Sequence, residues 1–283
     1  IKNKMILKSF SKINLSLKVN RKLKNSRLHE IQSYFCLVNL YDDIKIKKIK
    51  DQKDIIRFRG KFSKYIKKSS NSVIDVLNIL RERNLISSYY SVSINKKIPV
   101  FGGMGGGTSN AIYLVKHLTR NKIDKNLLKV LSKRIGSDIR IFLYQQGFIS
   151  NLKKIYSFQK KHSLYFLLVY PTIKCSTKYI YSKVRKFSQK SDFSFKKIEV
   201  KNKFIKLLIG ENNNLQSIVE NKYPTIKRLI IEIRQRKGCY FSRMTGSGSV
   251  CYGVFKSKKS AKAALNIIKV KYPKYSSWVA KTI

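Results

Sequence analysis

The chain has 283 residues, 43% of them hydrophobic, which is enough for one large domain or two ordinary ones with a substantial core. Lysine and arginine total 62 against 14 acids, which gives a formal net charge of +48. This composition excludes wholesale disorder, and the longest apolar run, 164–170, is too short to cross a membrane.

Alternating apolar residues indicate several strands within the first 60 residues. These strands are expected over 5–10, 13–19, 31–40, 44–49 and 55–59. Asn71 is suited to cap a helix whose apolar positions run from Val73 to Leu85. Further elements of this half are a strand over 90–94, helices over 109–118 and 126–135, and a strand over 148–158.

The pattern breaks into polar residues around 159–162, where we place a domain boundary. This gives an N-terminal domain over 1–158 and a C-terminal domain over 159–283. The second half predicts strands at 164–170, 241, 250–255 and 278–283, and helices at 176–184, 215–221, 224–236 and 258–270. Strands followed by mixed elements indicate an α+β protein of two domains.

The excess of basic residues has two explanations. One is a surface for nucleic acid, but the basic residues are spread along the chain without the arginine and aromatic blocks of RNA-binding modules. The other, which we favour, is an AT-rich genome, because Lys, Ile, Asn, Tyr and Phe are all abundant. Four cysteines without a C-x-x-C pair, and no signal-peptide pattern, predict a cytoplasmic protein with reduced thiols.

Five of the 13 glycines fall within 102–107, immediately before a predicted helix. Glycine lets backbone N–H groups approach a ligand, and a helix N-terminus favours phosphate. The spacing matches neither a P-loop, since Thr108 stands where Lys is required, nor a dinucleotide fingerprint. We therefore predict a phosphate-binding loop of a different kind, with a hinge as the alternative.

Phosphate transfer to a hydroxyl needs a base and a nearby cation. Most of the 14 acids fall in polar stretches, on amphipathic helices, or at strand turns, as we expect for Asp42 and Asp43. Asp138 precedes the apolar run 141–143 and is expected to be partly buried, either as a base or as a helix cap. Lys12 lies between apolar residues of a predicted strand, an unusual place for a lysine.

Together these segments resemble the GHMP kinase superfamily. The similar motifs, in family order, are 11–15 (S-K-I-N-L), 27–33 (R-L-H-E-I-Q-S), 99–111 (P-V-F-G-G-M-G-G-G-T-S-N-A), 135–142 (I-G-S-D-I-R-I-F) and 244–249 (M-T-G-S-G-S). The first two are most like the branch that phosphorylates a cytidine-diphosphate-linked methylerythritol in the non-mevalonate route to isoprenoids. The implied fold is a ribosomal-protein-like N-terminal domain and a ferredoxin-like C-terminal domain.

The resemblance also implies roles. Asp138 matches the general base and Lys12 its paired catalytic lysine, with ATP and Mg²⁺ as the donor. The implied ATP-binding residues are Pro99, Gly102, Gly103, Met104, Gly105, Gly106, Gly107, Thr108 and Ser109. The implied substrate-binding residues are Asn14, His29, Gly246, Ser247 and Gly248, with His29 reading the cytosine and Tyr181 a candidate to stack on it. The motifs identify no metal ligand.

Four positions depart from the family pattern. Leu28 replaces a Tyr that stacks on the cytosine, Arg27 a Gly, Arg140 a Pro, and Asn214 an Asp. Because stacking on a base is worth about 1–3 kcal/mol, weaker substrate binding is expected.

Two alternatives stay open from the sequence. One is another GHMP kinase, of the homoserine or mevalonate type, and the other is a drifted protein that only binds nucleotides or nucleic acid. We expect a small-molecule substrate, no membrane partner, nucleic-acid binding limited to non-specific charge attraction, and a monomer or homodimer.

Overall fold

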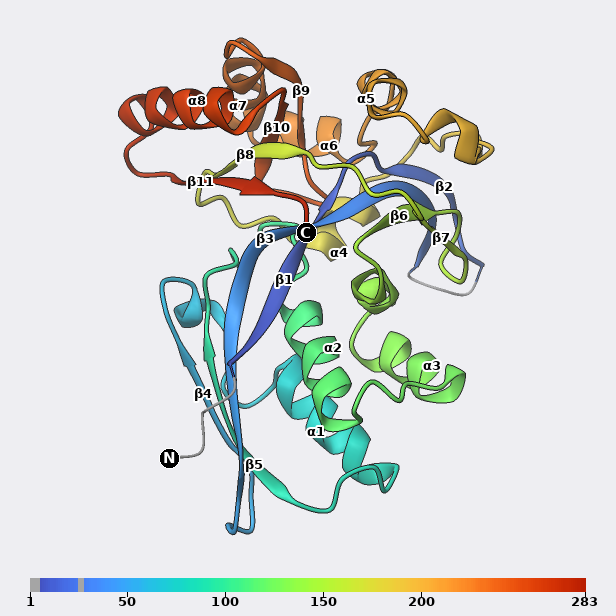
Figure 1. Ribbon diagram of the computed structural model, residues 1–283, viewed down its shortest axis with the longest axis vertical. Helices are drawn as coiled ribbons and strands as arrows, with labels where there is room; N and C mark the ends of the chain where they lie inside the picture. The colour runs from blue at the N-terminus through green and yellow to red at the C-terminus, as the bar shows by residue number, and fades with distance from the viewer. Residues whose placement is uncertain (1–5, 25–27) are drawn as a thin grey trace. The chain divides into compact units, whose positions relative to one another are not determined.

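The computed structural model describes residues 6–24 and 28–283, so Met5 and Arg27, both considered above, lie outside the described residues (Figure 1). The chain forms two compact units. Unit 1 contains residues up to Ser11, Leu40–Val100 and Gly105–Leu143, and unit 2 contains Lys12–Asn39, Phe101–Met104 and Tyr144–Ile283. The domain boundary after residue 158 stays a prediction.

Unit 1 consists of a sheet and three α-helices. Its elements are the first part of β1 (Ile6–Asn14), the second half of β3 (His29–Ile49), β4 (Ile55–Arg59), η1 (Ser63–Tyr65), α1 (Ser72–Glu82), β5 (Tyr89–Asn95), α2 (Gly106–Leu118), α3 (Lys125–Arg134) and η2 (Ser137–Leu143). β5 pairs antiparallel with β3 and parallel with β4, and β1 pairs with β3. The chain reaches β5 from β4 through α1, as a parallel pair requires.

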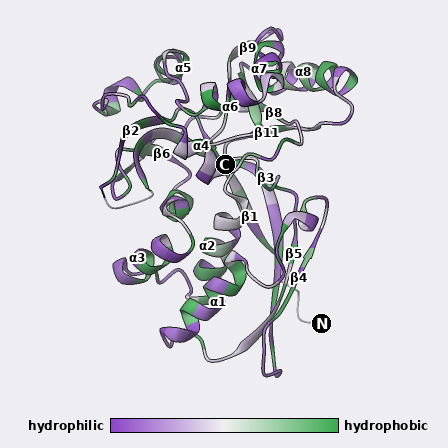
Figure 2. Cartoon of the chain, turned by 180° about the vertical axis from the view of Figure 1, so that it is seen from behind, coloured by the Kyte–Doolittle hydropathy of each residue, from purple (hydrophilic) through white to green (hydrophobic). Residues whose placement is uncertain are grey.

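The core of unit 1 lies where α1 packs against α2. Val76, Leu77 and Leu80 of α1 and Leu114 and Val115 of α2 are fully buried. Figure 2 shows hydrophobic and hydrophilic residues mixed along these helices, as expected for helices with one buried face.

Unit 2 contains a strand ribbon and a separate four-stranded sheet. Its elements are β2 (Lys18–Lys22), the first half of β3, β6 (Gln146–Ile149), β7 (Ile155–Ser157), β8 (Tyr165–Tyr170), α4 (Thr177–Ser182), η3 (Phe195–Lys197), α5 (Lys201–Gly210), α6 (Gln216–Lys222), α7 (Pro224–Arg234), β9 (Cys239–Met244), β10 (Cys251–Phe255), α8 (Lys258–Lys271) and β11 (Ser276–Lys281). β3 pairs with β2 and with β6, which pairs with β7.

The four-stranded sheet has the order β11–β8–β10–β9, and all its pairs are antiparallel. In the central register, Leu168 of β8 lies between Tyr252 and Trp278. α7 and α8 pack against this sheet, and together they cover it (Figure 1). Among the described residues, no helix has the length and apolar content needed to span a bilayer.

Several strand predictions were wrong in detail. The two strands expected over 31–40 and 44–49 form the single strand β3, and Asp42 and Asp43 therefore lie inside a strand and not at a turn. The strand expected over 13–19 is interrupted between Asn14 and Lys18. The strand expected over 148–158 is the hairpin of β6 and β7.

The helix predictions agreed better with the structure than the strand predictions did, apart from the start of α2 and the presence of α5. Asn71 caps α1 as expected, because its side chain accepts hydrogen bonds from the backbone N–H groups of Val73 and Ile74. α2 begins at Gly106, inside the glycine run, and not at Ser109. α5 was not predicted, because only three buried apolar residues mark it within a basic stretch.

Candidate active site

Lys12 and Asn14 lie at the end of β1, where the strand enters unit 2, and both are buried. The Lys12 ammonium donates a hydrogen bond to Oδ1 of Asn14. The Asn14 amide donates to Oγ of Ser33 over 2.8 Å, and its backbone N–H donates to Oγ1 of Thr245 over 2.9 Å. The backbone N–H of Lys12 donates to the carbonyl of Met104 over 3.1 Å. The predicted lysine is thus a buried cation, fixed beside two glycine-rich segments.

The turn 245–248 lies against the Gly102–Met104 part of the first glycine loop, within unit 2. Gly103 has φ +73° and Gly246 has φ +55°, both in the left-handed region. A Cβ on Gly246 would stand 2.8 Å from the Gly103 carbonyl oxygen and 3.3 Å from Nζ of Lys12. A Cβ on Gly103 would collide with the Thr245 carbonyl. Glycine is therefore required at both positions for the backbones to pack this closely.

Further hydrogen bonds fix this turn. Ser249 and Val250 donate their backbone N–H groups to the carbonyls of Phe101 and Gly102 over 3.1 and 3.2 Å. The Asn213 amide donates to the carbonyls of Met244 and Gly246 over 2.8 and 2.9 Å. Ser247 is buried and shares a 2.8 Å hydrogen bond with Thr177.

The rest of the glycine loop belongs to unit 1 and starts α2. Gly105 is the N-cap residue with φ +69°, and no side chain caps the helix there among the described residues. Its first-turn N–H groups are therefore available for an anion. Ser109 is fully buried, and its hydroxyl donates to the Phe10 carbonyl over 2.6 Å. Thus Ser109 attaches the helix to β1, whereas Gly107 and Thr108 are more exposed.

Asp138 lies in the first turn of η2, which packs against α2 and α3 in unit 1. It is half-buried, as expected from the sequence. Gly136, two residues earlier, has φ +149° and accepts a hydrogen bond from the N–H of Ile139 over 3.2 Å. This tight turn presents the carboxylate at the start of the element.

His29 is the first residue of β3, and two aromatic rings lie against it. The Tyr181 ring centroid is 5.2 Å away, and the Phe187 ring is stacked at 6.4 Å. Burial and the nearby Lys22 ammonium lower the pKa of His29. Its Nδ1 is buried without a hydrogen-bond partner among the described residues. Sequence reasoning missed Phe187, because no motif covers 185–194.

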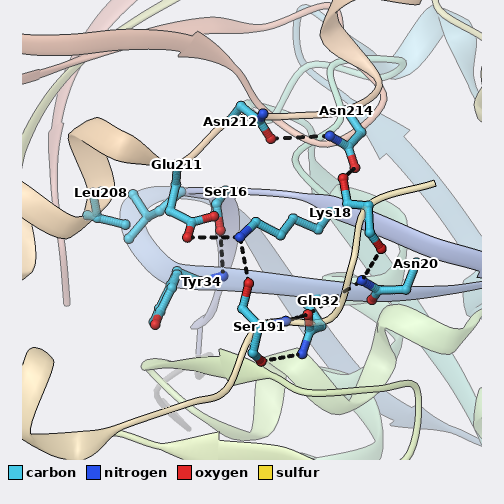
Figure 3. A network of polar contacts seen from close by, with 12 residues as sticks. Ser16, Lys18, Asn20, Gln32, Tyr34, Ser191, Leu208, Glu211, Asn212 and Asn214 are labelled. Carbon is cyan, nitrogen blue, oxygen red and sulfur yellow. Dashed lines mark hydrogen bonds and ion pairs between the residues drawn. The ribbon is translucent and has the colours of Figure 1, made fainter. Parts of the chain in front are cut away.

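Phe187 belongs to the segment 186–191, which has no regular structure but is held by polar side chains of the β2–β3 ribbon (Figure 3). Lys18 donates to Oγ of Ser191 over 2.6 Å and pairs with Glu211 over 3.1 Å. Gln32 exchanges two hydrogen bonds with the backbone of Ser191, at 2.8 and 2.9 Å. The position of Phe187 is therefore fixed by the fold and not by its own secondary structure.

Asn214, where the resemblance leads us to expect Asp, belongs to the same network. Its Oδ1 accepts hydrogen bonds from the N–H of Val19 and the hydroxyl of Ser188, both over 2.8 Å. Phe187, Ser188 and Asn214 also line a cavity of about 430 Å³. Both acceptor functions need only one side-chain oxygen, so Asn performs them as well as Asp would.

Comparison with known proteins identifies the class of protein to which the chain belongs. Residues 203–274 match the family model described as GHMP kinases C terminal. The fold is that of GHMP kinases: a crystal structure of 4-(cytidine 5'-diphospho)-2C-methyl-D-erythritol kinase superposes with a TM-score of 0.75 at 20% identity, over 98% of each chain. The mevalonate kinase of Methanococcus jannaschii superposes with a TM-score of 0.70 at 18% identity, over 100% of this chain and 99% of that one.

Relatives found by sequence identify the particular family within this class. The 4-diphosphocytidyl-2-C-methyl-D-erythritol kinase of Pelagibacter ubique (strain HTCC1062) is 35% identical over 286 aligned positions, which cover 99% of this chain and 100% of the relative. The corresponding enzyme of Wolbachia sp. subsp. Drosophila simulans (strain wRi) is 32% identical, with 98% and 97% covered. The chain belongs to the family of 4-diphosphocytidyl-2-C-methyl-D-erythritol kinases.

Proposed function

We propose that this kinase transfers the γ-phosphate of ATP to the 2-hydroxyl of 4-diphosphocytidyl-2-C-methyl-D-erythritol in the non-mevalonate route to isoprenoid precursors. The observation that carries the proposal is the buried Lys12, hydrogen-bonded to Asn14 and packed beside the Gly246 turn. An ammonium held beside a glycine turn can stabilise the negative charge that develops during phosphate transfer, so this placement supports a role in handling phosphate. The identity of the substrate is inferred from membership of the family.

In this mechanism Asp138 accepts the proton of the 2-hydroxyl group. The hydroxyl oxygen attacks the γ-phosphorus, the bond to the bridging oxygen breaks, and ADP leaves without a phosphoenzyme. Lys12 positions the hydroxyl and offsets the negative charge of the transition state. The uncapped N–H groups at the start of α2 bind the phosphates of ATP.

Mg²⁺ fits these residues as an ion that enters with the nucleotide. The described residues contain no group of three or more His, Cys, Asp or Glu able to hold a metal. Mg²⁺ is usually bound through phosphate oxygens and a few protein oxygens. Thr108, partly buried in the first turn of α2, would offer its hydroxyl oxygen to the ion. When bound, the ion neutralises charge on the phosphates.

His29, Tyr181 and Phe187 would bind the cytosine base. The rings supply stacking, and the unpartnered Nδ1 of His29 supplies hydrogen bonding. Since the four cysteines are unpaired thiols, three of them buried, we also place the enzyme in the cytoplasm.

The test measures ADP release with Mg-ATP and the cytidine substrate for the wild-type chain and for Asp138→Asn. Removing a general base should lower turnover by roughly 10²–10⁴-fold, while ATP affinity stays near the wild-type value. The matched control is Asp124→Asn, which changes an acid of the same unit that only caps α3, and which Asn can replace.

Two results would contradict the proposal. Equal losses of turnover and ATP affinity in Asp138→Asn would remove Asp138 as the base. Turnover on homoserine or mevalonate but not on the cytidine substrate would change the substrate while leaving the kinase assignment in place.

A further inference from the structure

The most deeply buried ion pair described in the molecule has no part in the mechanism above. Asp42, in the middle of β3, is 0% exposed, and the Lys96 ammonium that pairs with it is 2% exposed. Neither group can reach a substrate directly. Both lie in unit 1, as does the part of the glycine loop that starts α2.

One oxygen of Asp42 holds the chain that leads into the glycine loop. Oδ1 accepts hydrogen bonds from the backbone N–H groups of Lys97 and Ile98, over 2.7 and 2.9 Å. Pro99, the first residue of the loop motif, follows directly. The carboxylate thus fixes the entry to the loop.

The other oxygen holds the helix that leaves the loop. Oδ2 accepts a hydrogen bond from the Asn110 amide over 3.0 Å, and Lys96 donates to Oδ1 of Asn110 over 2.8 Å. Asn110 also donates to the Ser9 hydroxyl over 3.0 Å. Asn110 is 2% exposed, so all its polar contacts are internal.

The two ends of the loop are in close contact above this network. A Cβ on Gly106, the first residue of α2, would stand 3.0 Å from Cγ2 of Ile98 and 3.4 Å from Nζ of Lys96. The backbone at the start of α2 therefore lies close to Ile98 and Lys96, with little room for a side chain between them.

Stability alone does not account for a buried ion pair here. Burial lowers the pKa of Lys96 while Asp42 opposes the shift, so desolvation offsets much of the attraction. A neutral pair of similar volume often stabilises a core equally well. What the charged network adds is a defined geometry, because each Asp42 oxygen bonds one end of the same loop.

We propose that Asp42, with Lys96 and Asn110, positions the glycine loop for the phosphates of the nucleotide. The inference rests on the proposed function only in taking this loop as the phosphate site. Asp42 is a positioning residue and touches neither substrate.

The test uses the double variant Asp42→Asn/Lys96→Met, which removes both charges together and avoids leaving one of them buried alone. We expect it to fold, with a thermal midpoint near that of the wild type. Its Kd for Mg-ADP, measured calorimetrically without acceptor, should rise at least tenfold. The KM for Mg-ATP should rise with it, while the KM for the cytidine substrate stays unchanged.

The matched control is Asp54→Asn/Arg81→Met. Asp54 has the same chemistry in the same unit, since it pairs with Arg81 over 3.0 Å and accepts from the N–H of Tyr90 over 2.8 Å, but it joins α1 to β5. Its removal should leave the Kd for Mg-ADP unchanged.

A folded Asp42→Asn/Lys96→Met variant with wild-type nucleotide affinity would overturn the inference. So would an equal loss of affinity in the control. If the wild-type chain binds Mg-ADP but does not phosphorylate the cytidine substrate, the proposed function fails and this inference stands. If the wild-type chain binds no nucleotide, both fail.

Discussion

Leu28 is one of the positions at which this chain departs from the motifs of the resemblance. It lies next to His29 and is 48% exposed, where the resemblance leads us to expect a Tyr that stacks on the cytosine. Phe187 and Tyr181 contact the His29 ring, so aromatic surface remains there. The cluster around His29 therefore contains a hydrogen-bonding residue and two aromatic rings, with an aliphatic side chain at position 28.

We expect Leu28→Tyr to lower the KM for the cytidine substrate by about tenfold, because one stacking contact is worth about 1–3 kcal/mol. The turnover number should change little, since the cytosine is remote from the hydroxyl group that is phosphorylated. Steady-state kinetics checks both values. The control is Leu85→Tyr, an equally exposed leucine in unit 1, and a similar effect there would contradict the assignment.

The lowered pKa of His29 predicts how substrate binding depends on pH. Burial and Lys22 lower its pKa below the ordinary 6.5, so the ring is neutral at pH 7. The KM for the cytidine substrate should stay constant from pH 8 down to 6.5 and rise only below the lowered pKa. Because the unfolded chain binds that proton more readily, stability also falls as the pH drops through 6.5.

Removing the Lys22 charge tests whether this ammonium contributes to the lowered pKa of His29. Lys22→Gln should raise the pKa of His29 and move the rise in KM to higher pH. An NMR titration of the ring measures the pKa directly, and an unchanged value would show that burial alone sets it.

Local sequence features could point to candidate catalytic residues but not to the residues around them, and the catalytic roles of Lys12 and Asp138 stay predictions. Lys12 and Asp138 could be singled out as candidates because a lysine in an apolar strand and an acid before an apolar run are locally unusual. Asp42 could not, because its partner Lys96 is 54 residues away. Phe187 was missed because its contact with His29 depends on the fold of unit 2.

Among the elements, the segment 186–191 depends most on its neighbours. It has no secondary structure, and its hydrogen bonds go to side chains of β2, β3 and the 211–214 loop and to the Val19 carbonyl. Such segments move easily when one anchor is lost. Its position should therefore respond to mutations away from the site.

We expect Asn214→Ala to raise the KM for the cytidine substrate several-fold and to cost about 1–3 kcal/mol of stability, because the N–H of the buried Val19 and the partly buried Ser188 hydroxyl lose their acceptor. The KM for ATP should not change. Asn214→Asp, which keeps the acceptor oxygen, serves as the control and should behave like the wild type in kinetics and thermal unfolding. A loss of activity in that variant would show that the Asn donor is the essential group.

Elements with strong local signals were predicted well, and those defined by pairing were not. α1 has a cap and a regular apolar stripe, and β4 was predicted with its observed bounds. The start of α2 at Gly106 runs against helix propensity, since glycine is a poor helix former. The length of β3 depends on its pairing with both β5 and β6, which a local pattern does not reveal.

For the whole molecule the dominant property is the net charge of +48. A surface this basic attracts any polyanion, and the attraction is screened by salt. It should raise the encounter rate with ATP and with the negatively charged substrate. It should also cause binding to nucleic acid without sequence preference.

We expect random duplex DNA to be retained at about 50 mM salt and released at about 500 mM, with equal affinity for unrelated sequences. The KM for ATP should rise over the same range. Fluorescence anisotropy and steady-state kinetics measure the two effects. Sequence-specific binding that persists at high salt would point instead to a nucleic-acid function.

The passage of β3 through both units has a consequence for synthesis on the ribosome. Every residue of unit 1 has been made once Leu143 is added. Residues 12–39 belong to unit 2, where Val38 bridges to Thr282 and Leu37 accepts a hydrogen bond from the N–H of Ile283. β2 and β3 can pair as soon as both have been made, but Leu37 and Val38 gain these partners only when translation is nearly finished. The middle of β3 would therefore complete its contacts late, and until then its exposed strand edge would be open to misassembly.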